Sequence, residues 1–76
     1  MNKERRGKLK KAIELLEQAK EIIEDVNMDE EFSFGSLNEG LQATMRGQQM
    51  EDCIDNMNEA MDYIEKSIDV LEDCFI

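Results

Sequence analysis

The C-terminal third of the chain is one seven-residue unit repeated three times, over residues 54–60, 61–67 and 68–74. Each unit begins with a large apolar residue followed by Asp, carries a second large apolar residue at its fourth position, and ends with a small residue. A strict seven-residue repeat predicts a helix with one apolar stripe, and such a stripe must pack against a partner helix. The repeat therefore predicts an all-α fold.

The stripe predicts a long C-terminal helix over about residues 46–75, with Thr44 as its N-cap. Large apolar residues recur along it at alternating steps of four and three. They are Met50, Ile54, Met57, Met61, Ile64, Ile68, Leu71 and Phe75. A parallel line of small residues, Cys53, Ala60, Ser67 and Cys74, would let another helix approach closely.

A first helix is predicted over about residues 4–27, ending near Asn27 and Asp29. Its apolar residues follow the same spacing, through Leu9, Ala12, Leu16, Ala19, Ile23 and Val26. Additional apolar residues, Ile13, Leu15 and Ile22, widen this stripe. A stripe of that width indicates contact with more than one neighbouring helix.

Residues 28–45 are predicted to form a structured linker, because a simple turn between helices needs only about 2–8 residues. Its large apolar residues, Phe32, Phe34, Leu37, Leu41 and Met45, are unusual for a solvated tether. Ser36 is expected to cap a one-turn helix over residues 37–42. We expect the linker to fold back and cover the open end of the helix pair.

At 76 residues the chain is predicted to be a single domain, residues 1–76. Two helices alone cannot bury stripes this wide. We therefore predict a two-helix antiparallel hairpin that self-associates into a four-helix bundle or a larger helical oligomer. The predicted interface between copies consists of Leu9, Ile13, Leu16, Ile23, Met50, Ile54, Met57, Met61, Ile64, Ile68, Leu71 and Phe75.

The composition argues against several functional classes. The chain has no His and two Cys, so we expect no metal site and no cofactor. Cys53 and Cys74 would lie about 31 Å apart on one helix, too far for a disulfide within the chain. We expect both to be buried thiols in a reducing compartment, with a bridge between copies as the alternative. No nucleophile beside a base and no phosphate-binding glycine loop is present, so we expect no enzyme.

Location and general partners also follow from the sequence. There is no apolar run long enough to span a membrane and no signal-peptide core, so we expect a cytoplasmic protein. The net charge of −10 argues against general nucleic-acid binding. The cations cluster in residues 3–11 and the carboxylates in residues 51–73. We expect the two clusters to pair across an antiparallel hairpin, although the basic one could instead grip a phosphate-bearing ligand. The acidic one is either a solvated face or a mimic of nucleic acid.

The most specific local signal surrounds Arg46, the only cation between Lys20 and Lys66. It stands where the second helix is predicted to begin, so its guanidinium and free backbone N–H groups could converge on one anion. Gly47 would let a ligand or backbone come close. The candidate ligand-binding residues are Arg46, Gly47, Thr44, Gln42 and Gln48. Alternatively, Arg46 pairs with Glu39 or another carboxylate of the linker.

The linker reads Leu37-Asn-Glu-Gly-Leu-Gln-Ala-Thr-Met-Arg-Gly-Gln-Gln-Met-Glu51. With the repeats after it, this segment resembles a group of small uncharacterised acidic proteins of Gram-positive bacteria and their phages. Their linker pattern is Leu-Pro-x-x-Leu-Gln-x-Ser-x-Arg-Gly-x-x-Met-Glu. Here Asn38 replaces the Pro and Thr44 the Ser. The resemblance implies a helical-hairpin fold and a bacterial or phage origin, but no reaction.

These observations predict a non-enzymatic, homo-oligomeric helical protein that binds another macromolecule through the acidic side of its second helix and the apolar linker. A phage-encoded inhibitor of a host protein, such as a defence protein, is the setting that the resemblance suggests. The alternative is a protein that sequesters an anionic nucleotide in an Arg46-lined pocket between subunits. A structural or regulatory dimer without a pocket is the third option.

Overall fold

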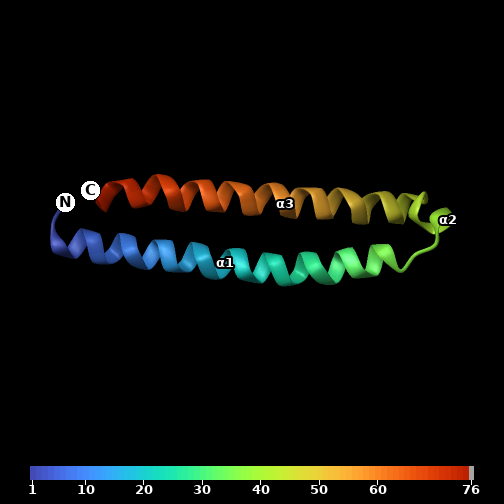
Figure 1. Ribbon diagram of the computed structural model, residues 1–76, viewed down its shortest axis with the longest axis horizontal. Coiled ribbons are helices and arrows are strands. Elements are labelled where there is room, and N and C mark those ends of the chain that lie inside the picture. The colour runs from blue at the N-terminus through green and yellow to red at the C-terminus, as the bar shows by residue number, and fades with distance from the viewer. Residues whose placement is uncertain (76) are drawn as a thin grey trace.

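The computed structural model describes residues 1–75, and the protein is all-helical over that range, as predicted (Figure 1). Helix α1 spans Lys3–Gly35 and the one-turn helix α2 spans Glu39–Gln42. Helix α3 spans Met45–Glu72 and continues into a 3₁₀ turn, η1, over Asp73–Phe75. The main packing contact is between the two long helices, α1 and α3.

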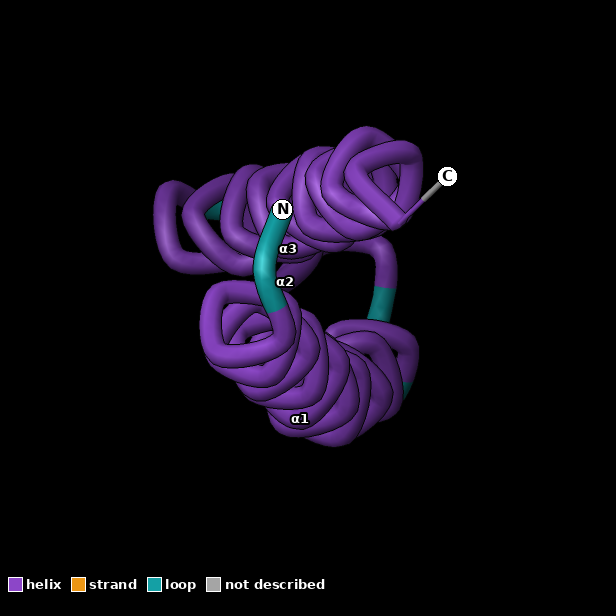
Figure 2. The backbone as a smooth tube through the Cα atoms, turned by 90° about the vertical axis from the view of Figure 1, so that its left-hand side faces the viewer, coloured by secondary structure: helices purple, strands orange, loops and turns teal. Residues whose placement is uncertain are grey.

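The two long helices lie side by side, with the start of α1 and the end of α3 at one end of the molecule and α2 at the other (Figure 1). Two side-chain contacts record the register: Lys20 meets Glu65, and Asn27 meets Asn58. Seven residues forward along α1 are thus matched by seven residues back along α3. Viewed along the long axis, the molecule consists of α1 packed beside α3 (Figure 2).

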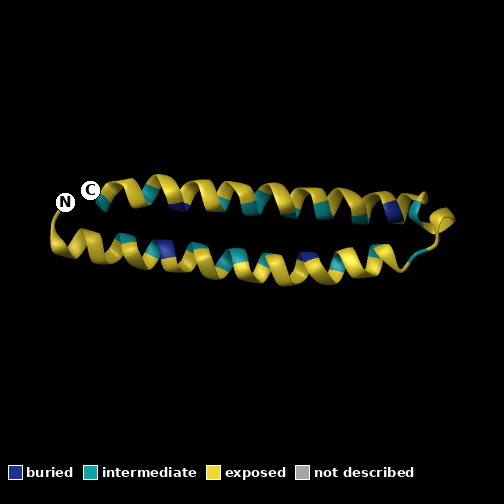
Figure 3. Cartoon of the chain, viewed as in Figure 1, coloured by how far each residue is buried: buried dark blue, intermediate teal, exposed yellow. Residues whose placement is uncertain are grey.

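The shape is a rod of 58 × 16 × 14 Å with a radius of gyration of 17.3 Å. A compact domain of this length has a radius of gyration of about 11 Å. The half-buried and buried residues lie on the facing sides of α1 and α3, and the outward sides are exposed (Figure 3). Among residues 1–75 only two hydrophobic side chains are buried, Ile13 and Ile68, each 8% exposed. The interior is therefore a narrow seam between two helices.

The predicted end of the first helix is wrong, because α1 continues from residue 27 to Gly35. Asn27 disfavours a helix interior only mildly, and here it is buried in the seam, where it bonds to Asn58. No Gly or Pro interrupts residues 28–34. Phe34 extends the half-buried seam by a further two turns. The linker predicted over residues 28–45 is consequently much shorter.

The predicted cap of the short helix is also wrong. Asn38, not Ser36, is the N-cap of α2, because its Oδ1 accepts a hydrogen bond from the Leu41 N–H at 2.9 Å. Ser36 instead follows the last residue of α1, and its hydroxyl donates to the Phe32 carbonyl at 2.8 Å. Asn caps the start of a helix as well as Ser does. Because α1 continues to Gly35, Ser36 is its C-cap, and Asn38 is the residue that directly precedes α2.

The start of α3 agrees with the sequence prediction, since Thr44 is its N-cap. Its Oγ1 accepts a hydrogen bond from the Gly47 N–H at 3.3 Å. The regular α-helix ends at Glu72, and the residues to Phe75 form the tighter η1 turn. The predicted helix over 46–75 is therefore correct except for its last turn.

Two expectations about side chains are wrong. Cys53 of α3 and Cys74 of η1 are exposed free thiols instead of buried ones, because both lie outside the seam. The basic start of α1 forms no ion pair with the acidic end of α3 within residues 1–75: Lys8 pairs with Glu4 in its own helix at 3.5 Å. No helix of the described chain is long and apolar enough to cross a bilayer.

Candidate functional site

The connection between the long helices is held by polar contacts to the backbone. The Gln42 Nε2 donates to the carbonyls of Phe34 and Leu37, at 3.1 and 3.0 Å. The Thr44 hydroxyl donates to the Leu41 carbonyl at 2.6 Å. The carbonyls of Phe34 and Leu41 also accept backbone N–H groups, from Leu37 and Thr44 at 3.1 Å each, so these side chains reinforce turns that the backbone closes. Gln42 and Thr44, both predicted to bind a ligand, therefore have structural partners.

Gly47 is buried where the first turn of α3 passes over α2. A Cβ at this position would overlap the Gln42 carbonyl oxygen and lie 2.7 Å from the Leu41 oxygen. The backbone that comes close to Gly47 is thus the chain's own. Glycine is required here by this close approach, not by an unusual φ, because no residue among 1–75 has a positive φ.

Arg46, the centre of the predicted anion site, is exposed and forms no ion pair within 4 Å in the described part of the chain. It lines two adjoining hollows, which share Ser33, Arg46 and Met50. One hollow adds Glu30 and Cys53, and the other adds Leu37, Leu41 and Thr44. Arg46 and Thr44 are therefore brought together, whereas Gln48 lines neither hollow.

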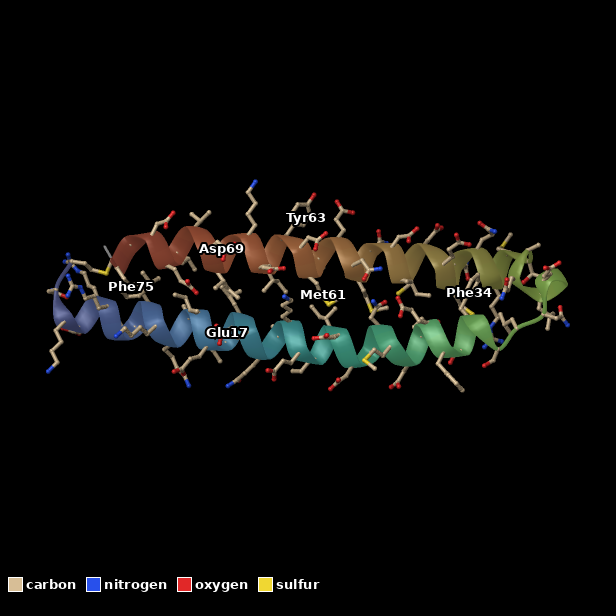
Figure 4. The ribbon with its side chains drawn as sticks, viewed as in Figure 1. Glu17, Phe34, Met61, Tyr63, Asp69 and Phe75 are labelled. Atoms are coloured by element: carbon tan, nitrogen blue, oxygen red, sulfur yellow. The ribbon has the colours of Figure 1, made fainter. Side chains whose placement is uncertain are left out.

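One flank of the seam is an acidic groove. Two hollows that share Lys20, Glu24 and Glu65 run along it and bring together carboxylates from both long helices. These carboxylates are Glu17, Glu21, Glu24, Glu31, Asp62, Glu65 and Asp69. Figure 4 labels Glu17 on α1 and Asp69 on α3. Lys20 is the only cation that lines the groove, and its Nζ lies 3.4 Å from Glu65 Oε2.

Asn27 lies beside Lys20 in the same groove and is 5% exposed. Its Nδ2 donates to Asn58 Oδ1 at 3.0 Å, but its own Oδ1 is buried without a hydrogen-bond partner. An unsatisfied buried acceptor costs about 1–3 kcal/mol. A polar residue at one seam position is also a known way to fix the register of paired helices. The sequence predicted Asn27 to lie near the end of a helix. The structure instead makes it a candidate for fixing the register of α1 against α3.

On the opposite flank, the lines of residues beside the seam carry no charged side chain over residues 12–26 and 53–74, although Glu59 and Lys66 stand at their outer edge. We call these two lines, which flank the seam on α1 and α3, the uncharged face. They are Ala12, Leu15, Ala19, Ile22 and Val26 of α1, Cys53, Asn56, Ala60, Tyr63, Ser67 and Val70 of α3, and Cys74 of η1. Ser33, which lies seven residues after Val26 on α1, and Cys53 of α3 line one hollow together with Glu30 and Arg46, so the two lines lie on the same side of the molecule.

Large apolar residues of the uncharged face are open to solvent: Ile22 is 64% exposed and Val70 is 59% exposed. Tyr63, which points away from α1 in Figure 4, is 62% exposed. Its hydroxyl donates to Glu59 Oε1 at 2.7 Å. This hydrogen bond, and then the negative charge of Glu59, raise the pKa of Tyr63 above 10.0.

The residues predicted for the interface between copies all lie in the seam of the single chain. Ile13 and Ile68 are buried there, and the other ten are half-buried. Their role between copies stays a prediction. The residues that the sequence reading missed are those of the uncharged face, although its small-residue line on α3 and the extra apolar residues of α1 were visible in the sequence.

Chemically, the described surface offers hydrogen-bonding, charged and apolar contacts. Within residues 1–75 no three His, Cys, Asp or Glu side chains are gathered as metal ligands would be. Comparison of the chain with protein-family models, with curated proteins and with solved structures gives no match. The acidic groove, the hollows beside Arg46 and the uncharged face are therefore the features that bear on function.

Proposed function

We propose that the protein is a non-enzymatic, self-associating helical protein that acts by binding another macromolecule. The observation that carries this proposal is the shortage of buried apolar surface. In the described part of the chain, two hydrophobic side chains are buried, whereas ten large hydrophobic residues are about half or more exposed. Domains this small usually need oligomerisation, a metal or disulfides to be stable. Both cysteines are free thiols, so no disulfide supplies that support.

The accessible surface supports the same proposal. The chain exposes 5948 Å². A folded monomer of 8.8 kDa exposes about 4,800 Å². The excess is roughly 1,100 Å², more than the ~800 Å² that each partner buries in a standard protein interface. Association between copies would reduce this excess.

The acidic groove is the surface proposed for the macromolecular partner. Its seven carboxylates face one cation, so it favours a segment rich in Lys or Arg. Such charge complementarity accelerates encounter and selects the partner more than it raises affinity. Inhibition of a host protein by a phage-encoded protein would be one use of such a surface.

Self-association is tested by unfolding the wild-type protein thermally over roughly a hundredfold range of concentration. Because dissociation accompanies the unfolding of an oligomer, the midpoint should rise with concentration. A midpoint that does not change with concentration would contradict the proposal.

Partner binding is tested with a Lys- and Arg-rich helical peptide. We expect binding that weakens with added salt and is lost when Glu24→Lys and Glu65→Lys are combined. The control is Asp52→Lys, an exposed charge reversal on α3 outside the groove. Equal binding by the groove variant and the control would contradict a role for the groove.

A second candidate function, the sequestration of an anionic nucleotide, is supported by one observation. Arg46 has no ion-pair partner within the described chain and lines two adjoining hollows beside the start of α3. A guanidinium next to free backbone N–H groups suits a phosphate. We expect a nucleotide to raise the unfolding midpoint of the wild type and of Lys66→Ala but not of Arg46→Ala. No shift across a nucleotide panel would exclude this candidate.

A further inference from the structure

We propose that the uncharged face is the surface through which two copies of the chain associate. This inference rests on the proposed self-association and adds to it the part of the molecule that makes the contact. The pairing of α1 with α3 already buries or half-buries the seam residues, so the side chains that it leaves open offer a second copy more surface. The uncharged face and the acidic groove are the two long flanks that remain.

Charge decides between these flanks. Each copy has a net charge of −10, so two copies repel one another in most orientations. The acidic groove would set carboxylates against carboxylates. The uncharged face has no charged residue at any of its positions, in a chain in which 37% of the residues are charged. Interface cores are depleted of charged residues in the same way.

The side chains of this face suit close packing of helices. Its outer rims carry the large residues Leu15 and Ile22 on α1 and Tyr63 and Val70 on α3, which are between 52% and 64% exposed. Between the rims run small residues such as Ala19 and Ser67. The face therefore offers bulky groups at its edges and a shallow centre that can receive the bulky groups of another molecule.

The dimensions of the face favour a second copy over a single foreign helix. The line from Cys53 to Cys74 is about 31 Å long at the helical rise. Two helices side by side are about 20 Å wide. On α1 the face runs only from Ala12 to Val26, about 21 Å. Two such faces would bury roughly 1,000 Å² together, at the lower limit of specific interfaces. One helix about 10 Å wide would leave half of the face in water, whereas another two-helix rod covers it.

The experiment compares two substitutions of equally exposed apolar residues on α1 by sedimentation velocity of the full chain. Ile22→Glu places a charge on the uncharged face, where the residue is 64% exposed. Met28→Glu places the same charge at a residue that is 62% exposed but lines the acidic groove. Helical content by circular dichroism checks that each variant folds. Val70→Glu repeats the test from α3.

We expect Ile22→Glu and Val70→Glu each to weaken self-association at least tenfold, and Met28→Glu to leave it within about threefold of the wild type. If the wild type associates and the variants on the uncharged face associate as tightly, this inference is overturned while the proposed function stands. A loss confined to Ile22→Glu would overturn the two-helix face as defined. A wild type that is a single chain at all concentrations would overturn both.

Discussion

The long seam and the short connection around α2 are built in different ways. The seam repeats the same apolar spacing along both helices, and nearly all of its residues are only half-buried. The connection is specified by single contacts, among them the two hydrogen bonds of Gln42 and the close approach at Gly47. The comparison indicates that many half-buried positions each contribute a little to the pairing of α1 with α3. The connection instead depends on a few specific residues.

The largest effect is expected from Gly47→Ala. The new Cβ would overlap the Gln42 carbonyl oxygen, which is backbone and cannot rotate away. We expect a loss of about 3 kcal/mol in the free energy of unfolding, from overpacking. The measurement is chemical denaturation monitored by circular dichroism.

The matched control is Gly35→Ala, where a Cβ meets nothing within 4 Å. It should be neutral or stabilise the helix by about 0.5–1 kcal/mol. Equal stability of the two variants would contradict the special role of the connection.

Gln42→Ala should have the next largest effect. It removes both hydrogen bonds to the carbonyls of Phe34 and Leu37, in a part-buried setting. We expect a loss of about 1–2 kcal/mol in the free energy of unfolding. Gln48→Ala, at an exposed position in the next helix, should change it by less than about 0.5 kcal/mol. A Gln48 variant as unstable as the Gln42 variant would remove the distinction.

Asn27→Leu tests the seam and should act in the opposite direction. It removes a buried acceptor without a partner and adds apolar surface, while the exposed Asn58 can bond to water. We expect a gain of about 1 kcal/mol, together with a broader range of assembly states, because a polar seam residue restricts register. Denaturation and solution mass measure the two effects. Destabilisation would show that Asn27 has a partner that the single chain lacks.

The smallest effect concerns Tyr63, the only tyrosine of the chain. Its hydrogen bond to Glu59 favours the protonated phenol, so its pKa is raised above 10.0. The contribution to stability is therefore present below pH 10 and is lost as the pH rises through the folded pKa. Titration followed by tyrosinate absorbance should give a lower midpoint for Glu59→Gln than for the wild type. An unchanged midpoint would contradict this cause.

The sequence predicted the elements that repeat and failed where single residues decide. The heptad spacing correctly indicated an all-α fold and the stripes that form the seam. Local residue preferences predicted a helix end near Asn27 and a cap at Ser36. In the structure Asn27 is held within the seam by Asn58, and Asn38 is the cap instead of Ser36. Burial of Cys53 and Cys74 was wrong because periodicity alone does not say which flank of a stripe is covered.

Of the candidate site, the sequence predicted that Thr44, Arg46 and Gly47 lie near one another at the start of a helix. It could not reveal that Gln42 and Gly47 hold the chain's own backbone, because such contacts depend on the three-dimensional path of the connection. The acidic groove and the uncharged face likewise require the pairing of α1 with α3, which sets the flanks of both helices side by side.

The central claim is that one chain leaves too much apolar surface in water to exist alone. Sedimentation equilibrium of the wild-type protein at micromolar concentration tests it most directly. The account predicts a mass that is a multiple of the 8.8 kDa chain, with helical circular dichroism. A folded, helical species with the mass of a single chain at every concentration would contradict it.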